Sequence, residues 1–329
     1  MSDAESLLDR AFPPLAEAVA AGRIPGGVLG VVDRDGELAF RATGFAQRVP
    51  ESRGMTAETW FDLASLTKVI FTTPRILAHA AAGRLNLDAP LTTLLPDFRQ
   101  YNADAWERKI TFRHCLGHQT PFPGVFPLYT YGDDPARLRA FVLQHEWVAG
   151  PAVYSDINFI LLGLALERLE GRSIRAMSPG ESFSWAPDPA ATAATEACPW
   201  RGRVLVGEVH DENCFALQGS GHAGLFGTAR SVLGYARALL DGTTDATLMR
   251  APLSPKRTHG WERPYDGWSG GDHCSAGTIG HTGFTGTGLW IDFDRGRAWT
   301  LLTNRVHPSR HFESGIVTLR RAVGDRING

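Results

Sequence analysis

The sequence predicts an α/β protein of the α+β kind, with an antiparallel sheet that is formed by both chain termini and flanked by helices. Apolar alternation bounded by turn residues marks two strands near the N-terminus, at residues 26–32 and 37–42. Three more runs of this type lie near the C-terminus, at residues 278–283, 288–293 and 298–304. Strands at both ends with helical patterns between them favour one sheet that both termini complete.

The region between the strands predicts an inserted, mostly helical domain. We therefore expect a sheet domain made of residues 1–72 and 220–329, and a helical domain of residues 73–219. A helix at residues 314–323 is expected to close the chain.

Composition excludes several classes of protein. With 329 residues, 43% of them hydrophobic and 21% charged, the chain can bury a large core. A net charge of -2 gives no reason to expect nucleic acid or an anionic membrane as a partner. The N-terminus lacks the pattern of a secretory signal, no apolar run is long enough to span a membrane, and the four cysteines are scattered. We expect a cytoplasmic protein with reduced thiols.

The first elements are a helix and a hairpin. Residues 7–21 carry apolar positions at helical spacing and end at Gly22, a residue typical of a helix C-cap. The strands at 26–32 and 37–42 are separated by the turn residues 33–36. The glycines here do not form the G-x-G-x-x-G pattern before a helix, so no dinucleotide site is predicted.

The stretch from Phe61 to Phe71 places a hydroxyl and an amine three residues apart, at Ser65 and Lys68. In the first turn of a helix these positions share a face, so the amine can take the proton of the serine. Pro74 is expected to kink or restart this helix, which ends near Gly83.

Residues 110–118 predict a short helix with Thr111 as N-cap. His114 and His118 have the i, i+4 spacing of a metal-binding pair, but the glutamate of an H-E-x-x-H motif is absent. We interpret both histidines as structural and expect no metal.

The remaining segments are assigned by pattern. Helices are expected at 135–147, from about 159 to 169, and at 229–240, with a long loop at 178–197. The glycine-rich residues 219–228 suggest close backbone packing. Residues 251–280 contain Trp261, Tyr265 and Trp268, which either line a pocket or pack within a loop.

Three short motifs then resemble those of a known family. Ser65-Leu66-Thr67-Lys68, Tyr154-Ser155-Asp156 and His281-Thr282-Gly283 occur in the order found in the serine β-lactamase and penicillin-binding-protein superfamily. The resemblance is closest to its class C-like branch, with family VIII esterases, serine DD-peptidases and D-aminopeptidases, and runs from about Ile24 to Asn304.

The resemblance implies a β-lactamase/transpeptidase-like fold with the active site in the cleft between the two domains. It implies that Ser65 is the acylated nucleophile, that Lys68 shares in proton transfer, and that Tyr154 is a second acid/base. Lys68 and Tyr154, crowded near a helix N-terminus, are expected to depress each other's pKa values. The oxyanion hole would use the backbone N–H groups of Ser65 and Phe284, and Thr282 and Gly283 would contact substrate. No cofactor is implied.

Two departures bear on the substrate. His281 stands where most β-lactamases carry lysine, and Asp156 stands where the family usually has asparagine. Both changes disfavour anionic substrates. His222 is interpreted as structural, while His281 could hydrogen-bond substrate.

The sequence thus predicts a β-lactamase-related serine hydrolase, of esterase type, that cleaves small uncharged acyl esters. D-amino-acid peptide or amide hydrolysis and weak β-lactamase activity are alternatives within the class. A ligand-binding sensor that is acylated without turnover, or a structural interaction protein, are alternatives of other classes. The expected partner is a small-molecule ester or amide, and no oligomeric state is predicted.

Overall fold

The computed structural model describes residues 2–329, and these form a main six-stranded sheet in the order β3-β2-β1-β11-β10-β9. The N-terminal half of the sheet comes from residues before 55 and the other half from residues after 277. The strands are β1 (Gly26–Val32), β2 (Leu38–Gln47), β3 (Arg53–Gly54), β9 (Thr278–Thr282), β10 (Thr287–Asp292) and β11 (Arg297–Thr303).

The two ends of the chain meet at the centre of this sheet. β1 pairs antiparallel with β2 on one side and with β11 on the other, so that Val28 lies between Ala42 and Leu302. All residues of β1 are buried, because the sheet is covered on both faces. The predicted sheet of both termini is therefore confirmed.

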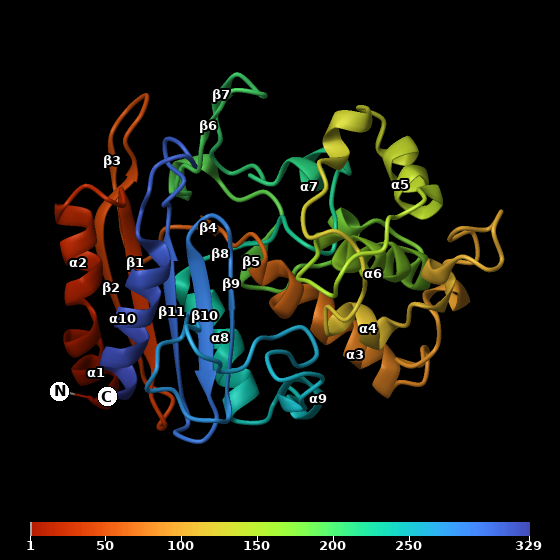
Figure 1. Ribbon diagram of the computed structural model, residues 1–329. Coiled ribbons are helices and arrows are strands. Elements are labelled where there is room, and N and C mark those ends of the chain that lie inside the picture. Colours follow the sequence, from red (N-terminus) through yellow and green to blue (C-terminus); the bar gives the residue numbers. More distant parts are fainter. Residues whose placement is uncertain (1) are drawn as a thin grey trace.

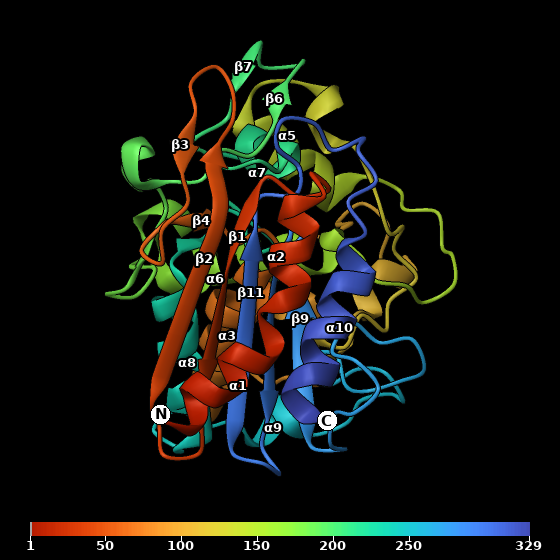
Figure 2. The same cartoon turned by 90° about the vertical axis from the view of Figure 1, so that its left-hand side faces the viewer.

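Helices cover the two faces of the sheet. The helices α1 (Asp3–Ala11), α2 (Pro13–Ala20) and α10 (Ile316–Asn328) lie on one face, which is turned toward the viewer in Figure 2. Helix α8 (Ala229–Leu240) covers the opposite face, and the helical part of the chain lies beyond it (Figure 1). A buried cluster between the sheet and the helices α1, α2 and α10 contains Leu15, Trp290, Trp299 and Val323.

One predicted element is wrong in its extent. The single helix expected at residues 7–21 is two helices, α1 and α2, which meet at Phe12. Pro13 and Pro14 follow directly, and proline is tolerated only in the first turn of a helix, so the second helix begins there.

The inserted region contains most of the remaining helices, including α6, whose residues from Ile157 to Leu166 are all buried. These elements are α3 (Thr73–Ala81), α4 (Phe112–Leu116), α5 (Pro135–Gln144), α6 (Asp156–Glu170) and α7 (Glu212–Ala216), followed by α9 (Thr247–Arg250) near the sheet. Short 3-10 turns lie at Leu91–Thr93, Trp106–Lys109, Leu128–Tyr131, Ile174–Ala176 and Pro189–Ala191. Thr111 caps α4 by accepting a hydrogen bond from the His114 N–H at 3.1 Å, which confirms the predicted N-cap.

Two small sheets connect distant segments. β4 (Phe61–Asp62), β8 (Phe226–Gly227) and β5 (Phe183–Ser184) form one, and β6 (Ala197–Cys198) with β7 (Arg203–Val204) forms the other. β8 pairs with both β4 and β5, so the segment before Ser65 is held beside the glycine-rich segment. The predicted domain boundaries at residues 72/73 and 219/220 stay a prediction.

Two further findings concern single segments. Trp261 and Trp268 are fully buried in the two main core clusters, which favours the packed-loop interpretation of residues 251–280. Among residues 2–329, no helix has both the length and the apolar character that crossing a bilayer requires.

Candidate active site

Ser65 lies in a strained turn between β4 and the following helix. The preceding residue, Ala64, has a φ of 46°, a left-handed conformation that is uncommon without glycine. The buried carboxylate of Asp62 holds this turn by accepting from the Ala64 N–H at 2.8 Å and from the His210 N–H at 2.6 Å. The turn therefore presents Ser65 at the start of a helix, where sequence analysis expected it.

Lys68 contacts the serine directly. Its Nζ donates to Ser65 Oγ at 2.8 Å and to the His222 carbonyl at 3.0 Å. Lys68 starts a π-helical turn, η1 (Lys68–Thr72), which leads into α3 at Thr73. Such turns are frequent at functional sites, and here the irregular turn also accommodates Pro74 near the start of α3.

Asp156 forms the third contact of the lysine. Its Oδ1 lies 2.7 Å from Lys68 Nζ, and the lysine side chain has no exposed surface while that of Asp156 is 32% exposed. Burial alone would lower the pKa of Lys68, but the charge of Asp156 reverses this effect, so that the pKa is raised. Lys68 is therefore a protonated ammonium near neutral pH.

Tyr154 lies just before α6 and faces the same lysine. Lys68 Nζ is 5.1 Å from the centroid of the Tyr154 ring, and both Lys68 and Ser65 act to lower the pKa of the tyrosine hydroxyl. Burial raises the pKa of Tyr154, and the ammonium offsets only part of this effect. Of the expected mutual lowering, Lys68 does lower the pKa of Tyr154, but burial outweighs this effect. The other half is wrong, because the charges of Asp156 and Tyr154 raise the pKa of Lys68.

The turn after β9 faces the serine turn. Thr285 Oγ1 donates to the carbonyl of Asp62 at 2.7 Å, and Thr287 Oγ1 donates to that of Leu63 at 3.1 Å. These bonds fix the Phe284 N–H relative to the Ser65 N–H. In the part of the chain that the structure describes, neither N–H donates to a protein acceptor, so both are free to bind an oxyanion.

Gly283 and Arg320 maintain this turn. A side chain at Gly283 would lie 2.6 Å from the carbonyl of Leu63, so the close approach of the two turns requires glycine. From α10, Arg320 Nη2 donates to the carbonyls of Gly283 at 2.9 Å and of Thr287 at 2.7 Å.

His281 is neutral at the site. Burial, followed by the charges of Lys68 and Arg257, holds the pKa of His281 well below its usual range. Its Nδ1 lies 3.0 Å from the carbonyl of Thr282, which can only accept, so Nδ1 carries the proton. Nε2 is then an acceptor, and it has no hydrogen-bond partner among residues 2–329.

Sequence reasoning did not identify two groups that contact Tyr154. His118, interpreted as structural, stacks on the Tyr154 ring with centroids 4.4 Å apart, and its Nδ1 accepts from the Ser155 N–H at 3.2 Å. Arg257 lies over the same ring, its Cζ 5.2 Å from the centroid. A positive φ of 50° at His118 is the kind of local strain found at functional sites, but it is visible only in the structure.

One set of side chains in residues 2–329 has atoms close enough to hold a metal, namely Asp156, Asp211 and His222, with one ligand atom each within 4.8 Å of the others. These groups already have partners. Asp156 pairs with Lys68, while His222 contacts Asp211 Oδ1 through Nε2 and Ser220 Oγ through Nδ1, both at 2.8 Å. The donor set is therefore accounted for by ion pairs and hydrogen bonds, and the expectation of a metal-free site stays a prediction.

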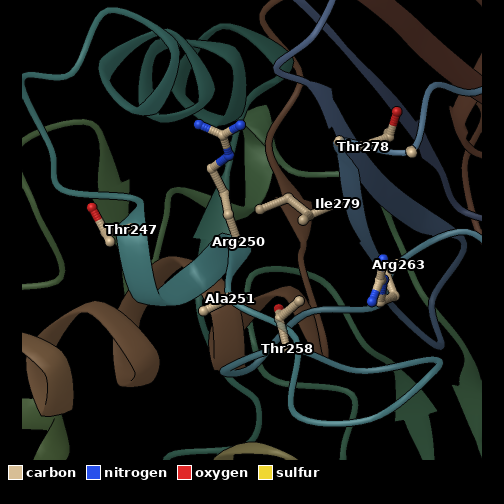
Figure 3. Close-up of a pocket in the computed structure, with 9 residues that line it drawn as sticks. Thr247, Arg250, Ala251, Thr258, Arg263, Thr278 and Ile279 are labelled. Carbon is tan, nitrogen blue, oxygen red and sulfur yellow. The ribbon is translucent and has the colours of Figure 1, made fainter.

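Two cavities differ in their relation to these groups. One, of about 680 Å³, is lined on one side by Thr282, Gly283 and Phe284 and on the other by residues 310–318. The other, of about 360 Å³, is lined by Arg250, Thr258, Arg263 and Ile279, among others, and by none of the groups at Ser65 (Figure 3). Only the first borders the candidate oxyanion hole.

Comparison with known proteins agrees with this geometry. A family model described as beta-lactamase matches residues 14–322. The chain belongs to the beta-lactamase family. Within it, the protein falls in the class C-like branch that includes esterases, DD-carboxypeptidases and class C β-lactamases, and it is a serine hydrolase of that family.

Individual relatives of this beta-lactamase-family chain differ in activity. An N-acetylmuramyl-L-alanine amidase of Bacillus subtilis is 30% identical, over 88% of this chain and 79% of its own length. Esterase EstB of Burkholderia gladioli is 33% identical, over 53% of this chain and 48% of its own length. A class C β-lactamase structure superposes with a TM-score of 0.78 at 16% identity, covering 100% of this chain and 98% of that one, which shows the shared fold.

Proposed function

We propose that this protein is an esterase that hydrolyses small, uncharged acyl esters through an acyl-enzyme on Ser65. The observation that carries the proposal is the contact of Ser65 Oγ with the Lys68 ammonium at 2.8 Å, together with the N–H groups of Ser65 and Phe284, which donate to no acceptor within residues 2–329. A nucleophile, a proton-transfer group and oxyanion donors are the parts that acyl transfer needs.

The charge of Lys68 decides the direction of proton transfer. Because the ammonium donates to Ser65 Oγ, the serine proton is free to pass to Tyr154, the acid/base group whose ring lies beside Lys68. Ser65 Oγ attacks the ester carbonyl carbon as its proton passes to the tyrosinate form of Tyr154, which the charge of Lys68 favours, and the oxyanion binds the two N–H groups. The tetrahedral intermediate then expels the alkoxide, which takes the proton from Tyr154. A water molecule repeats the sequence on the acyl-enzyme and releases the acid.

The preference for an uncharged substrate follows from His281 and Asp156. His281 is neutral, so position 281 offers a substrate carboxylate no positive charge. Asp156 places a partly exposed carboxylate beside Lys68 and uses the lysine charge itself. An anionic substituent beside these two residues would be repelled by Asp156 and would gain no ion pair from position 281.

The test is hydrolysis of p-nitrophenyl butyrate by the purified protein and by Ser65→Ala. We expect steady turnover by the wild type, a loss of about 10⁴-fold or more in the variant, and covalent labelling of Ser65 by a fluorophosphonate. The melting temperature of the variant serves as the control for folding. Substantial activity in Ser65→Ala would overturn the mechanism.

Two outcomes would support the alternatives of other classes. A single stoichiometric burst of p-nitrophenol without a steady state would indicate a sensor that is acylated and not turned over. Absence of both turnover and fluorophosphonate labelling would indicate a structural interaction protein.

Amide hydrolysis is a second candidate, and one observation favours it. The relative that is 30% identical over 88% of this chain is an N-acetylmuramyl-L-alanine amidase. Comparing kcat/KM for N-acetylmuramyl-L-alanine, a D-amino-acid amide, a cephalosporin and p-nitrophenyl butyrate separates the candidates, and a higher value for an amide would replace the esterase proposal.

A further inference from the structure

The site lacks a permanent cation at position 281, but one lies nearby on a different segment. Arg257 belongs to the irregular segment between α9 and β9, which no motif marks. Its Cζ is 5.2 Å from the centroid of the Tyr154 ring, a distance typical of a cation–π contact. On the same ring, Lys68 Nζ is 5.1 Å from the centroid, so two cations are in contact with Tyr154.

We propose that Arg257 is a positioning residue for the acyl-transfer reaction, because its guanidinium supplies next to Tyr154 the fixed positive charge that position 281 lacks. This inference rests on the proposed function and concerns the ionisation of the acid/base group in that same site.

The backbone holds Arg257 in this place. Isolated antiparallel bridges join Arg257 to Glu262, and Glu262 to Gly280 in β9, the residue before His281. Glu262 also pairs with the guanidinium, with Oε1 3.1 Å from Nη2. Both side chains are largely buried, at 18% and 15% exposure, so the guanidinium is anchored to the strand that carries His281.

One hydrogen-bond donor of the Arg257 guanidinium has no acceptor in residues 2–329. This donor is Nη1, which is buried. Leaving a buried donor unpaired costs about 1–3 kcal/mol. A charge retained at this cost beside the acid/base group is consistent with a role in the reaction.

The effect of the Arg257 charge on Tyr154 depends on the other groups that face the tyrosine. They are Ser65, Lys68, His118, Asp156, Arg257 and His281. Burial of the two histidines is the largest cause that keeps them neutral, and the charge of Arg257 contributes to this in both. Asp156 is the one anion in this set, and it opposes the tyrosinate form of Tyr154. The positive charge of Arg257 favours the tyrosinate form of Tyr154, which is the form that accepts the proton of Ser65.

The experiment is the pH dependence of kcat for p-nitrophenyl butyrate in the wild type, Arg257→Gln and Arg257→Lys. In Arg257→Gln we expect the ascending limb to move up by about one pH unit, and kcat near neutral pH to fall about tenfold. Arg257→Lys keeps the charge and should stay within about threefold of the wild type, with the limb unmoved.

Two further variants act as controls. Arg263→Gln removes a cation of the same segment that lines the separate cavity of Figure 3, and its profile should match that of the wild type. Glu262→Gln breaks the ion pair but keeps the charge of Arg257. The ascending limb of its pH profile should therefore stay in place or move to lower pH. If Arg257→Gln loses melting temperature without a shift of the limb, or if the lysine variant loses as much as the glutamine variant, the role is structural and the inference is overturned.

The rate of Ser65 labelling by a fluorophosphonate, measured across the same pH range, separates this inference from the proposed function. Labelling of the wild type with an unchanged profile in Arg257→Gln overturns the inference alone. Failure of the wild type to label removes the proposed function, and the inference with it.

Discussion

Lys68 illustrates how single contacts decide the chemistry of the site. Its side chain is fully enclosed, yet Ser65 Oγ, the His222 carbonyl and the Asp156 carboxylate surround its ammonium. A buried ammonium without a nearby anion would lose its proton, because desolvation penalises the charged form. Asp156 therefore keeps Lys68 charged, and this charge supports the proposed role of Tyr154 as the proton acceptor.

Asp156→Asn should lower both the pKa of Lys68 and the stability of the fold. Removing one partner of a buried ion pair leaves an uncompensated charge, and we expect a loss of about 2 kcal/mol, less than for a fully enclosed pair. Because the chain contains only three lysines, NMR titration of labelled lysine amines can follow Lys68 directly.

The matched control is Asp88→Asn, which removes a carboxylate from an exposed pair with Arg113. That variant should change neither the Lys68 titration nor the stability appreciably, since exposed pairs contribute little. An unchanged Lys68 titration in Asp156→Asn would show that another group holds the lysine charge.

At the scale of elements, helix α6 and the glycine-rich segment position the lysine and the tyrosine together. A side chain at Gly221 would lie 2.5 Å from the carbonyl of Phe159 in α6. A side chain at Gly163 on the same helix would lie 2.6 Å from the backbone nitrogen of Gly221. The next residue, His222, provides the carbonyl that accepts from Lys68. The predicted close backbone packing of this segment is thus confirmed, and it is part of the construction of the site.

Gly221→Ala should therefore affect stability and activity together. The added methyl group forces α6 away from the segment, with an expected cost of about 2–3 kcal/mol, and it displaces the His222 carbonyl. Urea unfolding and ester hydrolysis measure the two effects.

Gly234→Ala is the corresponding control. Gly234 lies on the exposed side of α8, and a side chain there would contact nothing within 4 Å. Alanine should stabilise that helix by about 0.5–1 kcal/mol and leave activity unchanged. If Gly221→Ala behaved in the same way, the proposed close contact with α6 would be disproved.

At the scale of the whole molecule, the site joins segments from most of the chain around buried, neutral histidines. The pKa values of His118 and His281 are held well below the usual range, first by burial and then by nearby cations. In the unfolded chain these histidines bind protons near pH 6.5, so the unfolded state binds more protons than the folded state below that pH.

Stability should therefore fall as pH drops below about 6.5. Each neutral histidine costs up to about 1.4 kcal/mol per pH unit below its unfolded pKa, so the pair predicts a loss of about 3 kcal/mol between pH 6.5 and 5. The carboxylate of Glu196, whose pKa is lowered to about 2 despite partial burial because His210 and Arg310 bond to it, affects stability only at more acidic pH. Urea unfolding at a series of pH values gives the slope.

Replacement of one histidine tests the assignment. His281→Gln should remove about half of the loss assigned to this pair between pH 6.5 and 5. Burial of His145, His259 and His307, whose pKa values are also lowered, adds to the total. Replacement of the exposed His311 by glutamine should leave the loss unchanged. If the free energy of unfolding of His281→Gln fell with pH as steeply as that of the wild type, the loss of stability would come from other groups.

The sequence by itself determined those features that depend on neighbouring residues or on a regular pattern. Alternation and turn residues predicted the hairpin of β1 and β2 and the three C-terminal strands, and the cap at Thr111 was visible in four residues. The order of the three motifs indicated the family, and Ser65, Lys68 and Tyr154 do lie together in the structure. The split between α1 and α2 was missed because an apolar period continues across Pro13 and Pro14.

Only the tertiary structure decided the charges and the supporting groups of the site. Asp62, His118 and Arg257 come from separate segments, so their contacts exist only once the chain has folded. The protonation of Lys68 and the neutrality of His281 depend on burial and on distances to charges far away in sequence. Residue types specify which groups can react, but a pKa is set by the solvent and the charges that folding removes from or brings to each group.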